Sequence, residues 1–202
     1  MADATKITLS DKELSLVTNA DWILTKQVII QKVYSLFAEN IPVIKTALAN
    51  TGFILPAEVL ASVPKIYKGE NYLQLPYVMF DYPRCFNGKN IFAVRTMFWW
   101  GNFFSVTLHI SGEYKNILRE SLLKSEHLLN SRFYIGVNED QWQHHFEENN
   151  FLPLDQLTKA DQIKLLGRND FTKLALKFDL HQWNNMPELL QESYHQIAAI
   201  LA

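Results

Sequence analysis

The sequence predicts an α+β protein in which an antiparallel β-sheet packs against several α-helices. Its most apolar segment, 72–111, is divided by turn sequences at 87–88 and 100–102 into three stretches rich in β-branched and aromatic residues, the pattern of a meander. Amphipathic helical patterns precede and follow this meander without regular strand–helix alternation. With 202 residues, the chain has the length of a single domain, 1–202.

The N-terminal quarter of the chain is predicted to be helical. Ser10 followed by Glu13 is a capping-box pattern that begins a short helix. From 22 to 50, apolar residues recur at steps of three and four, as on one face of a long amphipathic helix. Pro42 lies within this pattern, so the helix either kinks or starts again with Asn40 as its cap. The apolar face of this helix is expected to pack on the meander.

The last two strands of the meander are predicted to form a hairpin with a three-residue loop at 100–102. This register places Phe98 opposite Phe104 and Arg95 opposite Thr107, so apolar residues gather on one face of the sheet and polar residues on the other. A two-residue loop would mix the two sets. One residue of the loop is expected to adopt the positive φ that such loops need.

The preceding strand carries a single charge, Asp81. If Asp81 shares the polar face with Arg95, the two side chains form a partly buried ion pair, because an isolated charge among apolar neighbours is costly. Pro83 cannot donate a backbone hydrogen bond, which indicates a bulge or an edge at that point of the strand.

Further elements are predicted after the meander. They are a helix at 113–129, a strand near 132–137, a polar helix from Asn138 to about Glu148, a short helix begun by Thr158 and Asp161, a strand near 171–180 and a last helix after Asn185. The strand at 171–180 alternates apolar residues with Lys173, Lys177 and Asp179, which predicts that one of its faces meets water.

Composition limits the function. The net charge of −2 comes from interspersed acids and bases, which argues against nucleic acid or an anionic membrane as partner. No apolar run approaches the ~20 residues of a membrane span and the first residues lack a secretory pattern, so a soluble, cytoplasmic protein is expected. The single cysteine, Cys85, fits a reducing compartment. No phosphate loop or metal-ligand motif occurs, and neither a cofactor nor a metal is predicted.

The best candidate site is the polar face of the meander, where the expected ligand-binding residues are Arg95, His109, Asp81, Thr107, Ser105 and Trp99. A few fixed polar groups among apolar walls are typical of a small-molecule pocket. Arg95 would bind a carboxylate or phosphate, and His109 would make one hydrogen bond. The hypothesis is a small, partly apolar, anionic ligand in a cleft between sheet and helices. An ordinary solvated sheet face would show the same pattern.

Two other classes of function stay open. Trp99 and Trp100, if exposed at their turn, would form a surface for protein interaction, with a homodimer as one outcome; if helices cover them, they belong to the core. A hydrolase or transferase would use Asp81, Arg95 and His109.

Two weaker patterns involve further residues. Cys85 could act as a nucleophile with His109 and Asp81, and His144 with Glu148 could reach one metal ion from a helix. Neither pattern is specific, because a lone cysteine and two ligands occur in many proteins.

Overall fold

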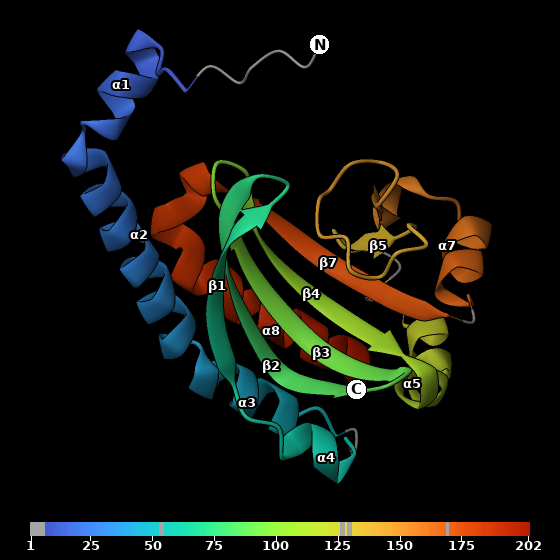
Figure 1. Ribbon diagram of the computed structural model, residues 1–202. Helices are drawn as coiled ribbons and strands as arrows, with labels where there is room; N and C mark the ends of the chain where they lie inside the picture. Colours follow the sequence, from blue (N-terminus) through green and yellow to red (C-terminus); the bar gives the residue numbers. More distant parts are fainter. Residues whose placement is uncertain (1–6, 53–54, 126–127, 129–130, 169) are drawn as a thin grey trace.

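The computed structural model describes residues 7–52, 55–125, 128, 131–168 and 170–202 (Figure 1). It contains a seven-stranded antiparallel sheet with the strand order β1-β2-β3-β4-β7-β5-β6. The strands are β1 (Lys65–Tyr72), β2 (Leu75–Asn87), β3 (Asn90–Trp99), β4 (Phe103–Ser111), β5 (Tyr134–Gly136), β6 (Phe151–Pro153) and β7 (Phe171–Asp179). The predicted α+β fold is confirmed, and β1 adds an edge strand to the meander.

The helices of the described ranges are α1 (Asp11–Val17), α2 (Ala20–Glu39), α3 (Ile41–Ala49), α4 (Ala57–Leu60), α5 (Gly112–Lys124), α7 (Lys159–Leu166) and α8 (Met186–Leu201), with 3₁₀ turns η1 (Leu154–Gln156) and η2 (Leu180–Asn185). None of them is long and apolar enough to cross a membrane. The predicted helix at 113–129 begins as expected, but four positions near its end, 126–127 and 129–130, lie outside the described residues.

Helices α2, α3, α5 and α8 pack on one face of the sheet, which we call the helical face (Figure 1). The expected contact between α2 and the meander is present, because the ring of Phe37 lies 6.1 Å from that of Phe80 and 6.4 Å from that of Phe104. On α8, the hydroxyl of Tyr194 lies 2.7 Å from that of Thr96, so the one polar pair at this point of the core is satisfied.

The predicted register of the β3–β4 hairpin is confirmed. Phe98 pairs with Phe104 and Arg95 with Thr107, and Gly101 in the three-residue loop has a φ of 71°. In the neighbouring pair of strands, Asp81 lies opposite Arg95, and the register shifts directly after it. The bulge that Pro83 suggested is therefore present.

The N-terminal helices extend beyond the sheet. The capping box at Ser10 is formed, and the chain starts a new helix after Asn40 rather than kinking. Only Ile30, Val33 and Phe37 of α2 are buried, all in its second half. Helix α1 and the first half of α2 therefore project from the body of the protein (Figure 1).

The prediction of a helix from Asn138 to Glu148 is wrong, because the segment 137–150 is irregular, with turns at 141–142 and 148–150. Side chains take the backbone N–H groups that a helix would use: Asn138 Oδ1 accepts from the N–H of Asp140, and the carboxylate of Asp140 accepts from that of Trp142. The N–H groups of His144 and His145 donate to the hydroxyl of Tyr72, a residue of β1. This segment, named the cover segment below, is thereby fixed to the sheet.

The prediction that one sheet face meets water is also wrong for most of that face. Ser105, Thr107, His109 and Lys173 are all buried, although the alternation of each strand predicted polar exposure. The cover segment lies over them on the side of the sheet away from the helices, which we call the opposite face. Lys177 and Asp179, farther along β7, remain exposed as predicted.

Candidate functional site

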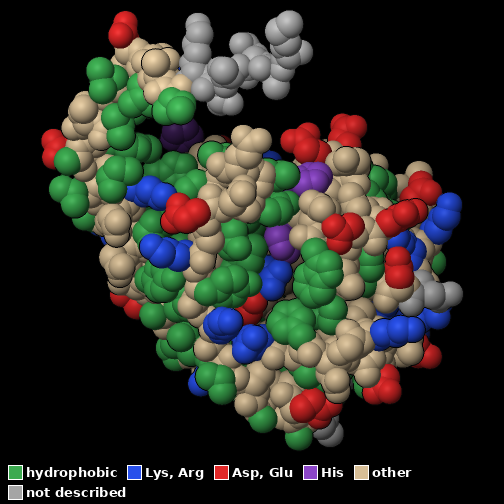
Figure 2. Space-filling view, in the orientation of Figure 1, with side chains coloured by type: hydrophobic (Ala, Val, Ile, Leu, Met, Phe, Trp, Pro, Cys, Tyr) green, Lys and Arg blue, Asp and Glu red, His purple; other side chains and the backbone are tan. Residues whose placement is uncertain are grey.

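The opposite face brings four of the predicted site residues together. The pairings across β2, β3 and β4 place Asp81, Arg95 and Thr107 in one row. The next row contains His109 of β4 and, on β7, Lys173. Figure 2 looks onto this side of the molecule and shows basic and histidine side chains among hydrophobic ones. These residues lie away from the helices, so they do not line a cleft between sheet and helices.

Asp81 and Arg95 form the expected ion pair. Arg95 Nε donates to Asp81 Oδ1 at 2.7 Å and Nη2 donates to Oδ2 at 2.9 Å, a bidentate geometry, and Tyr67 donates to the same carboxylate at 3.2 Å. Burial disfavours the charged guanidinium and is the largest single influence, but the hydrogen bonds to Asp81, its charge and the nearby Tyr67 and Tyr77 together outweigh it and hold the pKa of Arg95 above its ordinary value. The carboxylate is thus fully occupied by its neighbours.

Lys173 lies beside this pair and is only 2% exposed. Its amine donates a hydrogen bond to the backbone carbonyl of Gln143 in the cover segment and lies 4.7 Å from the ring centroid of Phe151. Burial and then the charge of Arg95 lower the pKa of Lys173 to about 7, although Asp140 acts in the opposite direction. No carboxylate among the described residues forms a salt bridge with this amine.

Two histidines complete the group. His109 lies 2.9 Å from Gln141 Oε1 through its Nε2, and burial together with Lys173 lowers its pKa to about 3. His144 Nε2 lies 3.3 Å from Arg95 Nη1, and burial followed by Arg95 lowers its pKa well below the ordinary value. Both rings are therefore neutral at neutral pH. Since Arg95 can only donate, His144 Nε2 is the acceptor of that contact.

A small space remains between these side chains. It is bounded by Ala93, Arg95, Thr107, His109, His144 and Lys173. Its volume, about 10 Å³ for the centre of a water molecule, is close to the room that one water needs. The enclosed site is therefore rich in hydrogen-bond donors, and none of the residues that line it carries a carboxylate.

The other two predicted site residues lie farther along the same face. Ser105 is buried between the neighbouring strands, and Trp99 packs in an apolar cluster with Met79, Met97 and Phe103. The indole of Trp99 donates to the carbonyl of Tyr72 at 3.2 Å. Neither residue lines the small space beside Lys173.

The aromatic turn is not an exposed tip. Trp99 is buried on the opposite face, whereas Trp100 is half-buried on the helical side. The ring of Trp100 lies 6.0 Å from that of Trp22 in α2. The condition for the interaction surface, an exposed pair of tryptophans, is therefore not met.

The catalytic patterns lack the required contacts. Cys85 pairs with Phe92 in the sheet, so it lies on the helical face, where its sulfur is 3.1 Å from the hydroxyl of Tyr114. His109 contacts Gln141 and not Asp81, whose oxygens are held by Arg95 and Tyr67. Within the described ranges, no three histidine, cysteine or acidic side chains come together as a metal site would require.

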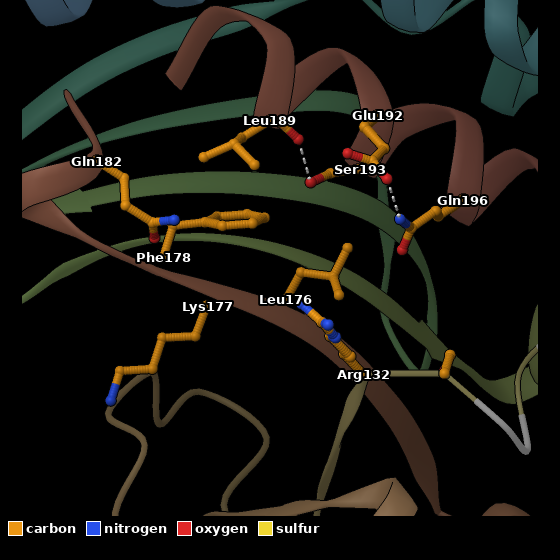
Figure 3. Close-up of a pocket in the computed structure, with 10 residues that line it drawn as sticks. Arg132, Leu176, Lys177, Phe178, Gln182, Leu189, Glu192, Ser193 and Gln196 are labelled. Carbon is orange, nitrogen blue, oxygen red and sulfur yellow. Dashed lines mark hydrogen bonds between the residues drawn. The ribbon is translucent and has the colours of Figure 1, made fainter. Parts of the chain in front are cut away.

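A much larger open cleft of about 800 Å³ lies elsewhere, between the outer half of β7 and α8 (Figure 3). The polar groups that α8 contributes to it are already paired, since Ser193 donates to the carbonyl of Leu189 and Gln196 donates to Glu192. Lys177 points away from the residues of α8 in this view. No buried charge converges on this cleft, so it is the weaker candidate for a ligand site.

Sequence reasoning missed Lys173 and His144. Lys173 could have been found only by pairing β7 with β4, which places it opposite His109. His144 was assigned to a polar helix, so its position beside Arg95 had no signal in the sequence.

The fold and the site thus define an α+β protein with a buried, donor-rich cluster under a loop. Comparison with known proteins assigns no family, and no curated protein or solved structure matches the chain.

Proposed function

We propose that this protein binds a small anion, or the anionic head of a partly apolar ligand, at Lys173, His109 and Arg95. The observation that carries the proposal is the amine of Lys173, which is buried beside a second cation and has no carboxylate partner among the described residues. A lone buried amine costs free energy, and a bound anion would offset that cost.

The cover segment supplies the oxygens that an anion would replace. His109 contacts the side-chain oxygen of Gln141, and Lys173 donates to the backbone oxygen of Gln143. Because the enclosed space has room for about one water, a larger ligand must displace these two contacts. Binding would then exchange two oxygens of the protein for two oxygens of a carboxylate, phosphate or sulfate.

The role of Arg95 differs from that of a direct anchor. Two of its nitrogens are committed to Asp81, and the third contacts His144. Its charge acts over a short distance in a buried environment, where electrostatic interactions are screened less than in water. Lys173 is therefore the anchor of the proposed site, with His109 as a second donor and Arg95 as a source of positive potential.

The test is a thermal-shift and calorimetric titration with phosphate, sulfate and decanoate at pH 6 and pH 8.5. We expect tighter binding at pH 6, because Lys173, with a pKa of about 7, is protonated below that pH and an anion favours its charged form. An anion at 100 times its Kd would stabilise the protein by about 2.7 kcal/mol.

Lys173→Met should abolish the shift, and Lys177→Met, which removes an exposed amine on the same strand, should leave it unchanged. Native mass spectrometry of the purified protein would show any ligand retained from the cell. A shift that survives Lys173→Met, or no shift with any of the three anions together with a bare native mass, would refute this proposal.

Three further proposals rest on composition alone. A cytoplasmic location follows from the single Cys85, a single domain from the length of the chain, and the lack of a nucleic-acid partner from the interspersed charges. An enzymatic use of Asp81, Arg95 and His109 has less support, because Asp81 is held by Arg95 rather than by His109.

A further inference from the structure

Helix α1 and the first half of α2, residues 7–28, form an exposed apolar arm. Nine large apolar side chains of this arm are between 45% and 101% exposed: Ile7, Leu9, Leu14, Leu16, Val17, Trp22, Ile23, Leu24 and Val28. Figure 2 shows hydrophobic side chains over this projecting part of the molecule. Scattered apolar residues on a surface are normal, but a continuous set of this size marks an interaction surface.

The arm is held in place by the body of the protein at its base. Lys26 forms a salt bridge of 2.6 Å with Glu70 of β1, and the ring of Trp22 packs against that of Trp100. Both of these contacts are made by α2, and α1 has no buried residue at all. The exposed side chains therefore belong to a positioned helix, and no other segment within residues 7–52, 55–125, 128, 131–168 and 170–202 covers them.

A groove continues directly from the arm. It measures about 570 Å³ and lies between α2, from Gln27 onward, and the junction of η2 with α8. Its lining combines apolar residues with polar ones: Val28, Leu36, Trp183 and Pro187 with Gln27, Gln31, Lys32, Ser35 and Glu39. The stretch of α2 along the groove, from Gln27 to Glu39, is about 20 Å long at 1.5 Å per residue. The arm from Ser10 to Leu24 has about the same length.

The outer stripe of α2 is self-complementary. Asp21, Leu24, Val28 and Lys32 follow one another at steps of three, four and four residues, so they lie on one side of the helix, and all four are exposed. If two copies of α2 cross in antiparallel orientation near residue 26, Leu24 of one faces Val28 of the other and Asp21 faces Lys32. By symmetry each contact occurs twice.

From these observations we infer that a second copy of this chain covers the arm, in a two-fold dimer in which the arm of each protomer lies along the groove of the other. This inference is independent of the proposed anion site. The buried area is sufficient: nine side chains that each bury on the order of 100 Å² give about the ~800 Å² per partner of a stable complex. A membrane surface fits less well, because the arm lacks the excess of basic residues that such helices carry: Asp11, Glu13 and Asp21 stand against Lys12 and Lys26, and Lys26 is already paired with Glu70.

The test is sedimentation velocity of the full chain at about 1 µM and about 100 µM, a range that brackets a Kd typical of such interfaces. We expect a dimer at the higher concentration. Leu24→Glu should weaken dimerisation at least about tenfold and leave the circular dichroism spectrum unchanged, because Leu24 is already exposed in the protomer. Ile163→Glu, which replaces another exposed apolar residue, on α7, is the control and should leave the dimer intact.

Charge reversal tests the orientation. Asp21→Lys or Lys32→Asp alone should weaken the dimer about tenfold, because two attractive contacts become repulsive, and the double variant should recover most of the loss. Any of three results would overturn the inference. The wild-type protein could remain a monomer at both concentrations, Leu24→Glu could leave the dimer unchanged, or the double variant could fail to recover the loss caused by the single reversals. Binding of a monomer to phosphatidylglycerol vesicles through the arm would overturn it as well.

Discussion

Replacing Lys173 by methionine tests the most unusual feature of the opposite face, a buried amine that forms no salt bridge with any carboxylate in the part of the chain that the structure describes. In the unfolded chain a lysine has a pKa near 10.5, whereas burial lowers the pKa of Lys173 to about 7 in the folded protein. At pH 7 the unfolded state therefore binds the proton of this lysine more strongly than the folded state does. At about 1.4 kcal/mol per pH unit, and with the amine half protonated in the folded protein at pH 7, this difference costs about 4 kcal/mol of folding stability at that pH.

Methionine has a similar shape and removes this cost. The substitution also leaves the carbonyl of Gln143 without its donor, a loss of about 1–3 kcal/mol. Lys173→Met should thus stabilise the protein by about 1–3 kcal/mol at pH 7. As the pH rises through the window from 7 to 10.5, the wild-type protein regains stability, so near pH 10 the two proteins should be about equal or the order reversed.

Urea denaturation at pH 7, 8, 9 and 10 measures this difference. Other groups that face Lys173, namely Arg95, His109, His144 and Asp140, are present in both proteins, so the difference between the two curves isolates the amine. Lys177→Met should give the wild-type pH dependence. A Lys173→Met protein that is less stable than wild type by the same amount at every pH would refute the reasoning.

Two further substitutions test the hydrogen bonds that hold the sheet. Asp81→Ala leaves the buried guanidinium of Arg95 without its carboxylate and should cost about 3–5 kcal/mol of unfolding free energy in urea, whereas Asp81→Ala with Arg95→Met should cost less than Asp81→Ala alone. Thr96→Val leaves the buried hydroxyl of Tyr194 without a partner and should cost about 1–3 kcal/mol; in a double-mutant cycle with Tyr194→Phe, additive losses would contradict the contact.

The sequence was sufficient for local features. The register of β3 and β4 follows from a short loop and two alternating strands, because a slip of one residue would have put Phe98 and Arg95 on the wrong faces. The ion pair of Asp81 with Arg95 followed from the cost of isolated buried charges. In both cases the partners are close in sequence, so few alternatives compete.

The sequence was insufficient where a contact joins distant segments. β7 pairs with β4 across more than 60 positions, and only this pairing brings Lys173 next to His109. The alternation of polar and apolar residues along β7 indicated a water-exposed face. No feature of the neighbouring sequence showed that the cover segment would exclude the water. That segment was itself predicted as a helix, because the capping pattern at Asn138 does not distinguish a helix start from the side-chain turn that forms.

The buried amine and the exposed arm are two different departures from the usual distribution of polar and apolar side chains, and the two proposals can be tested separately. Lys173 places a charge where apolar side chains would be more stable, and the arm places apolar side chains where polar ones would be more soluble. Neither feature contributes to the stability of an isolated protomer. If each serves binding, Lys173→Met should abolish anion binding and leave the sedimentation coefficient unchanged, whereas Leu24→Glu should separate the protomers and leave the anion titration unchanged. Loss of both properties in either variant would mean that the anion site and the arm depend on each other.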